Sequence, residues 1–297
     1  RKHMHILWLI AVPLMWSFVG ILVKAASVMF SSSIISLSRF LFGAMFLGVI
    51  LLVRDKRLQI TWKNAWIWIG VGGKSLNYIL ENIAIRMGAA SGNMIVSPLQ
   101  AVFMAIVSVL FFKERMTPAK VVAILMCMGG SVLISLKGQP FSLFLESGLL
   151  PLLLFTVSAM GASAHVISQK KLITRMDSAD MNFSVFLLST LVTAVPIPFD
   201  STISPPVTFL GVFALVALGF ITGISFLMYA KALKKVSLLA ATLLGNSSVL
   251  FILLWAWLFY GEEVNASMVL GAVIMAAGLI LINLPLPLLE PEPCRVS

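Results

Sequence analysis

Residues 111–115 read Phe-Phe-Lys-Glu-Arg, and 148 positions later residues 259–263 read Phe-Tyr-Gly-Glu-Glu. The same shift places residues 130–135, Gly-Ser-Val-Leu-Ile-Ser, on residues 278–283, Gly-Leu-Ile-Leu-Ile-Asn. Each pair joins a short polar motif or a glycine to a long apolar run. Self-similarity at one fixed spacing indicates that the chain contains two copies of the same structural unit.

The segments around these motifs are too apolar for a soluble protein. Of the 297 residues, 60% are hydrophobic and 11% are charged, whereas soluble domains average about 25% charged residues. A membrane-spanning helix needs about 20 mostly apolar residues. The segments that meet this requirement are 5–24, 34–53, 65–85, 93–112, 119–137, 147–168, 182–199, 207–230, 237–260 and 267–284. We therefore predict an all-α membrane protein of ten helices, with five-helix repeats over 5–137 and 147–284.

The basic residues predict how the repeats lie in the membrane. The net charge is +10, and Lys and Arg accumulate in cytoplasmic loops. With a cytoplasmic N-terminus, 16 of the 21 basic residues fall on the cytoplasmic side. The loop after the fourth helix contains Lys113 and Arg115, but its counterpart after the ninth contains Glu262 and Glu263. The second repeat is therefore expected to be inverted, with both termini cytoplasmic and no nucleic-acid-binding surface.

Inverted repeats are typical of secondary transporters, and four motifs support that class. They are Leu14-Met15-Trp16-Ser17-Phe18 with Lys24 downstream, Ser97-Pro98-Leu99-Gln100, Phe112-Lys113-Glu114-Arg115-Met116-Thr117, and the glycines Gly129, Gly130, Gly271 and Gly278. In order and duplication they resemble the ten-helix EamA-type members of the drug/metabolite transporter superfamily. The resemblance implies transport of small metabolites, amino acids or drugs without ATP. It also implies alternating access to a cavity between the first, third, fourth, sixth, eighth and ninth helices.

The third predicted helix contains unusual polar residues. Lys74, Asn77, Tyr78, Glu81 and Asn82 are spaced so that they share one helix face. Ionisable groups inside a membrane cost about 2.5–3.5 kcal/mol each on insertion scales, so they are candidates for function. We expect Lys74 to hold a substrate carboxylate or another anion, and Glu81 to meet an amine or carry a proton. The alternative is that they only neutralise each other or their neighbours.

Other helices supply further candidates for the substrate cavity, namely Trp16, Ser97, Gln100, His165, Tyr229 and Asn246. His165 is either a titrating gate, a cavity hydrogen-bond partner or a packing residue. The Gly245-Asn246 sequence suggests a broken helix that exposes groups for binding, or a helix–helix hydrogen bond. Arg39 is expected to extend to the nearby membrane surface. The four glycines are expected at close helix crossings, and Gly70, Gly72 and Gly73 are expected to loosen the third helix for gating.

No Walker A, HExxH or GxSxG motif occurs in the sequence, so we predict neither an enzyme, nor a cofactor, nor a metal site. The predicted function is export of amino acids or related small carboxylated metabolites across the cytoplasmic (inner) membrane. One alternative is export of lipophilic cations or drugs, and another is a non-transporting sensor or scaffold. The expected partners are a small-molecule substrate and the lipid bilayer, with protons as a candidate coupling ion. The oligomeric state stays open.

Overall fold

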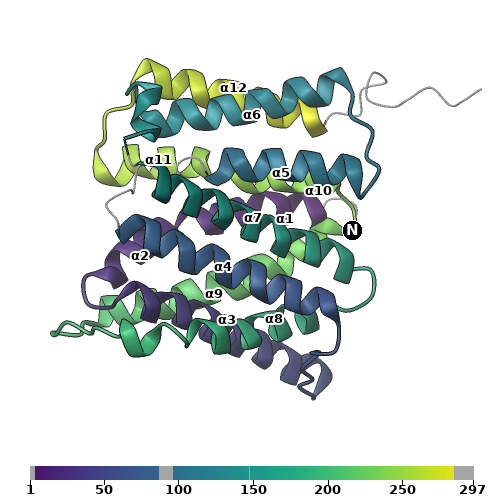
Figure 1. The fold of residues 1–297 in the computed structure, drawn as a ribbon, viewed down its shortest axis with the longest axis vertical. Helices are drawn as coiled ribbons and strands as arrows, with labels where there is room; N and C mark the ends of the chain where they lie inside the picture. Colours follow the sequence, from purple (N-terminus) through teal and green to yellow (C-terminus); the bar gives the residue numbers. More distant parts are fainter. Residues whose placement is uncertain (1–3, 87–95, 147, 284–297) are drawn as a thin grey trace, which may run out of the picture.

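The computed structural model describes residues 4–86, 96–146 and 148–283, and within these ranges nearly all regular structure is helical. The α-helices are α1 (Met4–Ser17), α2 (Val19–Ser27), α3 (Ser32–Asp55), α4 (Ala65–Arg86), α5 (Val96–Leu110), α6 (Pro118–Leu136), α7 (Leu149–Leu172), α8 (Ser178–Thr193), α9 (Phe209–Leu233), α10 (Leu238–Asn246), α11 (Ser248–Tyr260) and α12 (Ala266–Asn283). Two short 3-10 helices, η2 (Phe141–Phe144) and η3 (Ile197–Phe199), lie in connections. The helices run side by side across the view in Figure 1.

Ten membrane-spanning segments account for these α-helices, because two expected spans are each divided into two helices. The first divides at Phe18, between α1 and α2, and the ninth at Ser247, between α10 and α11. The break in the ninth span follows Gly245, where the sequence predicted a broken helix. The break in the first span was not predicted. Within the described ranges, 7 segments are long and apolar enough to span a membrane, when α1 with α2 and α10 with α11 are each taken as one segment. Helix α4 is not among them, because its polar face lowers its hydropathy.

The two halves of the chain interdigitate. The most extensive packing joins α4 with α7, α6 with α12, and α3 with α9 and α8, and each of these pairs crosses between the halves. Helix α9 packs on α1 and α2 in the same way as its counterpart α4 packs on α7. This reciprocal pairing is the pattern of two inverted repeats, and it places α6 and α12 together at one edge of the molecule (Figure 1).

Glycines permit the closest of these crossings. A methyl group added to Gly130 of α6 would lie 2.5 Å from the carbonyl oxygen of Gly271 in α12, and one added to Gly271 would lie 2.7 Å from that of Gly130. Gly278 is similarly close to α6, whereas Gly129 faces open space, so the expectation of a close crossing at Gly129 was wrong.

The three glycines before Lys74 do not act alike either. A methyl group on Gly73 would lie 2.5 Å from the carbonyl oxygen of Gly161 in α7, and one on Gly70 would lie 2.6 Å from the hydroxyl of Ser168. Gly72 has nothing nearby. Gly70 and Gly73 therefore sit at a tight crossing of α4 with α7 and not in a loosely packed region.

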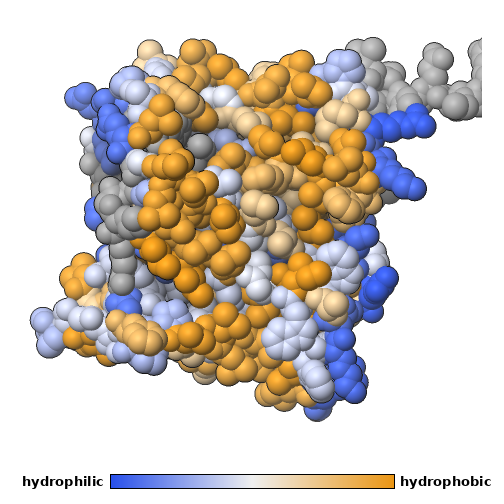
Figure 2. All heavy atoms as spheres, in the orientation of Figure 1, coloured by the Kyte–Doolittle hydropathy of each residue, from blue (hydrophilic) through white to orange (hydrophobic). Residues whose placement is uncertain are grey.

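The surface separates into an apolar band and two polar ends. In Figure 2 hydrophobic side chains fill the middle of the visible face and hydrophilic ones lie along the two sides. Mid-helix side chains such as Val49, Leu125 and Val273 are 59%, 62% and 61% exposed. So large an exposed apolar surface requires a lipid environment. We call the end formed by loops 56–64, 111–117, 173–177 and 234–237 the basic face.

Candidate functional site

All ten side chains that the sequence suggested for a substrate site line one central cavity of about 320 Å³. They are Trp16, Lys74, Asn77, Tyr78, Glu81, Ser97, Gln100, His165, Tyr229 and Asn246. The cavity is bordered by α1, α2, α4, α5, α7, α9, α10 and α11, which are the helices that the resemblance implied. Helix α3 also contributes, through Arg39. Cavities that bind small molecules typically measure roughly 300–1,000 Å³.

Helix α4 provides the polar wall of the cavity. The Lys74 side chain is buried at 8% exposure, and its Nζ lies 3.4 Å from Asn77 Oδ1. Asn77 Nδ2 donates to Ser158 Oγ of α7 at 2.8 Å, and Ser158 Oγ donates to the carbonyl oxygen of Asn77 at 2.9 Å. These hydrogen bonds, together with the close contact of Gly73 with Gly161, fix the position of Lys74 along α7. Asn82 departs from the expected face, because its amide donates to Ser36 Oγ of α3 at 2.8 Å and lines a separate pocket.

Aromatic rings form the opposite wall. The Trp16 ring lies 5.3 Å from the Phe226 ring and 5.5 Å from the Tyr229 ring, measured between centroids. Trp16 Nε1 donates to Ser225 Oγ of α9 at 2.8 Å, which fixes the orientation of the indole. A methyl group on Gly245 would lie 2.8 Å from the same indole, so the end of α10 fits Trp16 because residue 245 has no side chain.

Arg39 of α3 belongs to the cavity, although the sequence suggested a side chain that extends to the membrane surface. Its guanidinium carbon lies 4.3 Å from the centre of the Tyr78 ring, and its Nε is buried with no hydrogen-bond partner among the described residues. Lys74 Nζ lies 4.6 Å from the centre of the same ring and 4.8 Å from that of Phe226. A cation over an aromatic face is attracted by the ring. The Tyr78 ring therefore attracts the positive charges of both Arg39 and Lys74.

His165 and Asn246 connect the cavity to its surroundings. His165 is fully buried, with its Nε2 3.3 Å from Gln169 Nε2 and its Nδ1 without a hydrogen-bond partner in the described part of the chain. Gln169 Nε2 also donates to Asn182 Oδ1 of α8 at 2.8 Å. Asn246 Nδ2 donates to the carbonyl oxygen of Ser97 at 3.4 Å, so the break in the ninth span bonds to the start of α5.

The cavity is displaced from the basic face. On α4 its lining runs from Lys74 to Glu81, away from that face, and on α5 it begins in the first turn at Val96. Apolar side chains fill the layer between this lining and the basic face. Among them, Ile67, Leu172 and Leu233 are fully buried. Along α4, α7 and α9, buried apolar side chains thus lie between the lining and the basic face.

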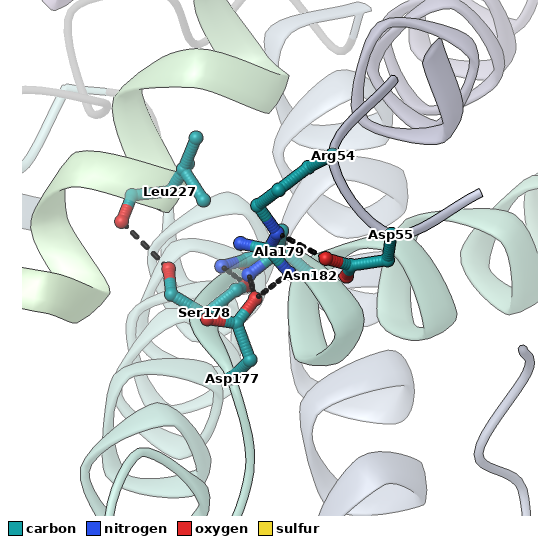
Figure 3. Close-up of polar contacts among 7 residues, drawn as sticks. All are labelled: Arg54, Asp55, Asp177, Ser178, Ala179, Asn182 and Leu227. Carbon is teal, nitrogen blue, oxygen red and sulfur yellow. Dashed lines mark hydrogen bonds and ion pairs between the residues drawn. The ribbon is translucent and has the colours of Figure 1, made fainter. Parts of the chain in front are cut away.

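A polar cluster at the basic face joins the two halves (Figure 3). Arg54, near the end of α3, forms ion pairs with Asp55 at 2.7 Å and with Asp177, before α8, at 2.9 Å. Asp177 Oδ2 also accepts the backbone N–H of Ala179 at 2.9 Å and caps α8. We call Arg54, Asp55 and Asp177 the clasp. Burial raises the pKa of the Asp177 carboxyl, but the hydrogen bonds from Arg54 and Ala179 outweigh it, and the net pKa is lowered.

The clasp is expected to contribute little stability at neutral pH and none in acid. Arg54 is 42% and Asp177 40% exposed, and exposed ion pairs contribute about 0–1 kcal/mol. Because folding lowers the Asp177 pKa, this contribution is complete above the unfolded pKa of about 4 and is lost as the pH falls through the folded value. Arg54→Gln should lower the thermal midpoint slightly at pH 7, with a difference that shrinks below about pH 4.

The exposed Arg57 provides the control for this experiment. Arg57→Gln removes the same charge from the same loop and should change the midpoint less than Arg54→Gln at pH 7. A difference between Arg54→Gln and the unmodified protein that persists or grows in acid would contradict the role of Asp177.

Comparisons with known proteins agree with this architecture. The model of the EamA-like transporter family matches residues 3–136 and again residues 149–284. A solved structure described only as a crystal structure of a protein is similar over 95% of this chain and 98% of its own, with a TM-score of 0.81 and 16% sequence identity. That identity supports the fold alone. No protein of curated function matches the chain.

Proposed function

The chain belongs to the EamA-like transporter family, and on this premise we propose that it exports amino acids or related small carboxylated metabolites across the cytoplasmic membrane. The observation that carries the proposal is the buried Lys74 ammonium in the wall of the central cavity. A charged donor in a low-dielectric site binds an anion strongly. Among the described residues its ammonium has one long hydrogen bond, although an ammonium can donate three.

The rest of the lining suits an amino acid. Glu81 offers a carboxylate to an amine from the same face of α4, and the rings of Trp16, Phe226 and Tyr229 offer an apolar surface to a carbon chain. Ser97 and Gln100 add polar groups at the start of α5. In this proposal Lys74 and Glu81 bind the charged groups of the substrate, and the other lining residues orient it.

Alternating access would operate between the two inverted halves. We propose that the basic face is cytoplasmic, because its loops and the helix ends next to them carry 13 of the 21 Lys and Arg residues. The cavity lies on the other side of a packed apolar layer, which corresponds to a state closed toward the cytoplasm. Opening toward the cytoplasm would separate α3 from α8, so the clasp of Arg54 and Asp177 would break. Protons remain a candidate coupling ion through Glu81.

The aromatic wall and Glu81 also fit the alternative substrate class, lipophilic cations. Two basic side chains in the cavity disfavour it, because a cationic substrate would be repelled by Arg39 and Lys74. A non-transporting sensor or scaffold could use the same cavity. A measurement of flux is therefore needed to distinguish a transporter from these alternatives.

The proposal is tested with purified protein in liposomes, each batch of which is loaded with the unlabelled form of the compound under test. Labelled amino acids, small carboxylic acids and a lipophilic cation such as tetraphenylphosphonium are added outside, and counterflow is followed in protein-containing and empty liposomes. We expect protein-dependent counterflow of at least one amino acid and none of the cation. Counterflow of the cation alone would establish the alternative. Thermal stabilisation by a carboxylate without any flux would point to a sensor.

A further inference from the structure

The charges of the cavity lining indicate a narrower class of substrate than membership of the EamA-like family does. Arg39 and Lys74 are the basic side chains of the described lining, and Glu81 is the acidic one. Ionised groups at the centre of a membrane are costly unless they are paired or lie in a water-filled cavity. The described lining therefore has one more positive than negative charge, which an anionic cargo would balance.

The two basic groups are close enough for one small molecule to reach both. The Arg39 guanidinium carbon and Lys74 Nζ lie 4.3 Å and 4.6 Å from the centre of the same Tyr78 ring, so they are at most about 9 Å apart. Arg39 Nε is buried without a hydrogen-bond partner in the described residues. A guanidinium pairs with a carboxylate through two parallel hydrogen bonds, and an orphaned buried donor is the arrangement that a ligand carboxylate would satisfy.

Resting on the proposed function, we infer that the preferred cargo is an acidic amino acid, with one carboxylate at Lys74, the second at Arg39 and the ammonium group toward Glu81. Its net charge of −1 complements the net charge of +1 on these three side chains. The Tyr78 ring, which both basic groups approach, contacts the carbon chain that joins the carboxylates. Arg39 is thereby the residue that distinguishes acidic from neutral amino acids.

L-Aspartate and L-asparagine provide the test, because they have nearly the same shape and differ by one charge. Counterflow in liposomes should favour aspartate over asparagine by at least tenfold in apparent affinity. Such a ratio corresponds to about 1.4 kcal/mol, slightly less than one hydrogen bond to a charged group usually contributes. In Arg39→Gln the ratio should fall toward one, and in Arg39→Lys, which retains the charge, part of it should return. Arg57→Gln, an exposed arginine outside the cavity, should preserve the ratio.

The outcomes separate this inference from the function on which it rests. If asparagine or another neutral amino acid is carried with the same apparent affinity as aspartate, the inference is wrong but amino-acid transport stands. An equal loss of both substrates in Arg39→Gln would also overturn it, because Arg39 would then support the cavity without selecting the charge. If no carboxylate is carried at all, the proposed function fails first. Each variant is scored only after it elutes as a single symmetric peak in detergent.

Discussion

Lys74→Met is expected to reduce amino-acid counterflow at least about 30-fold and to leave the protein folded. The substitution retains the length and the apolar stem of the side chain but removes the ammonium that faces the cavity. Losing one partner of a buried charged pair costs about 2–5 kcal/mol of binding, which corresponds to a loss of about 30-fold to several thousand-fold. Because the variant also removes a buried charge, its thermal midpoint should be unchanged or higher.

The comparison with stability separates binding from a structural role. If Lys74 served only to neutralise Glu81, Lys74→Met would lower the midpoint, and adding Glu81→Gln would restore it. The exposed Lys235 at the basic face provides the control, because Lys235→Met removes an equal charge outside the cavity. Full counterflow in a folded Lys74→Met protein would refute the anion site.

Gly130→Leu is expected to abolish folding, whereas Gly129→Leu, one residue earlier, is expected to be tolerated. Even a single carbon on Gly130 would lie 2.5 Å from Gly271 O and 2.8 Å from the backbone nitrogen of Met275. Ordinary overpacking costs about 1–3 kcal/mol when side chains can shift. Here the obstacle is the backbone of α12, so α6 and α12 would have to separate.

Detergent extraction followed by size-exclusion chromatography measures this difference. Gly129→Leu should elute as the unmodified protein does, because Gly129 is exposed with no neighbour that a methyl group would meet. Gly130→Leu should be absent or aggregated, and Gly130→Ala should give a lower thermal midpoint. Equal behaviour of the two leucine variants would show that the crossing is wrongly placed.

The sequence was most informative where a single helix decides the outcome. The spacing of Lys74, Asn77, Tyr78 and Glu81 predicts a shared face because helical geometry is local, and these four side chains do line one cavity. Asn82, at the edge of the same face, instead bonds to Ser36 of α3. Which neighbour a helix face meets depends on packing between distant segments, and periodicity does not contain that information.

The errors have the same origin. The position of Arg39 near one end of its helix favours a side chain directed to the membrane surface, but contact with Tyr78 of another helix draws it into the cavity. Gly129 and Gly130 are equivalent by composition, and only the position of α12 distinguishes them. The break at Phe18 has no proline or glycine at that residue to signal it.

The interdigitated packing of the two halves has a consequence for biosynthesis. When a ribosome has completed residues 1–146, the inserted helices have not yet met α7, α8, α9 and α12, which will become their principal neighbours. Gly73 and Gly130 then still lack Gly161 and Gly271, the glycines that they contact in the complete chain. Helices α4 and α3 can therefore pair as soon as α7, α8 and α9 are inserted, whereas α6 stays without its principal partner until α12 (Ala266–Asn283) has been translated. During that interval quality-control proteases would meet a substrate that the mature protein no longer presents.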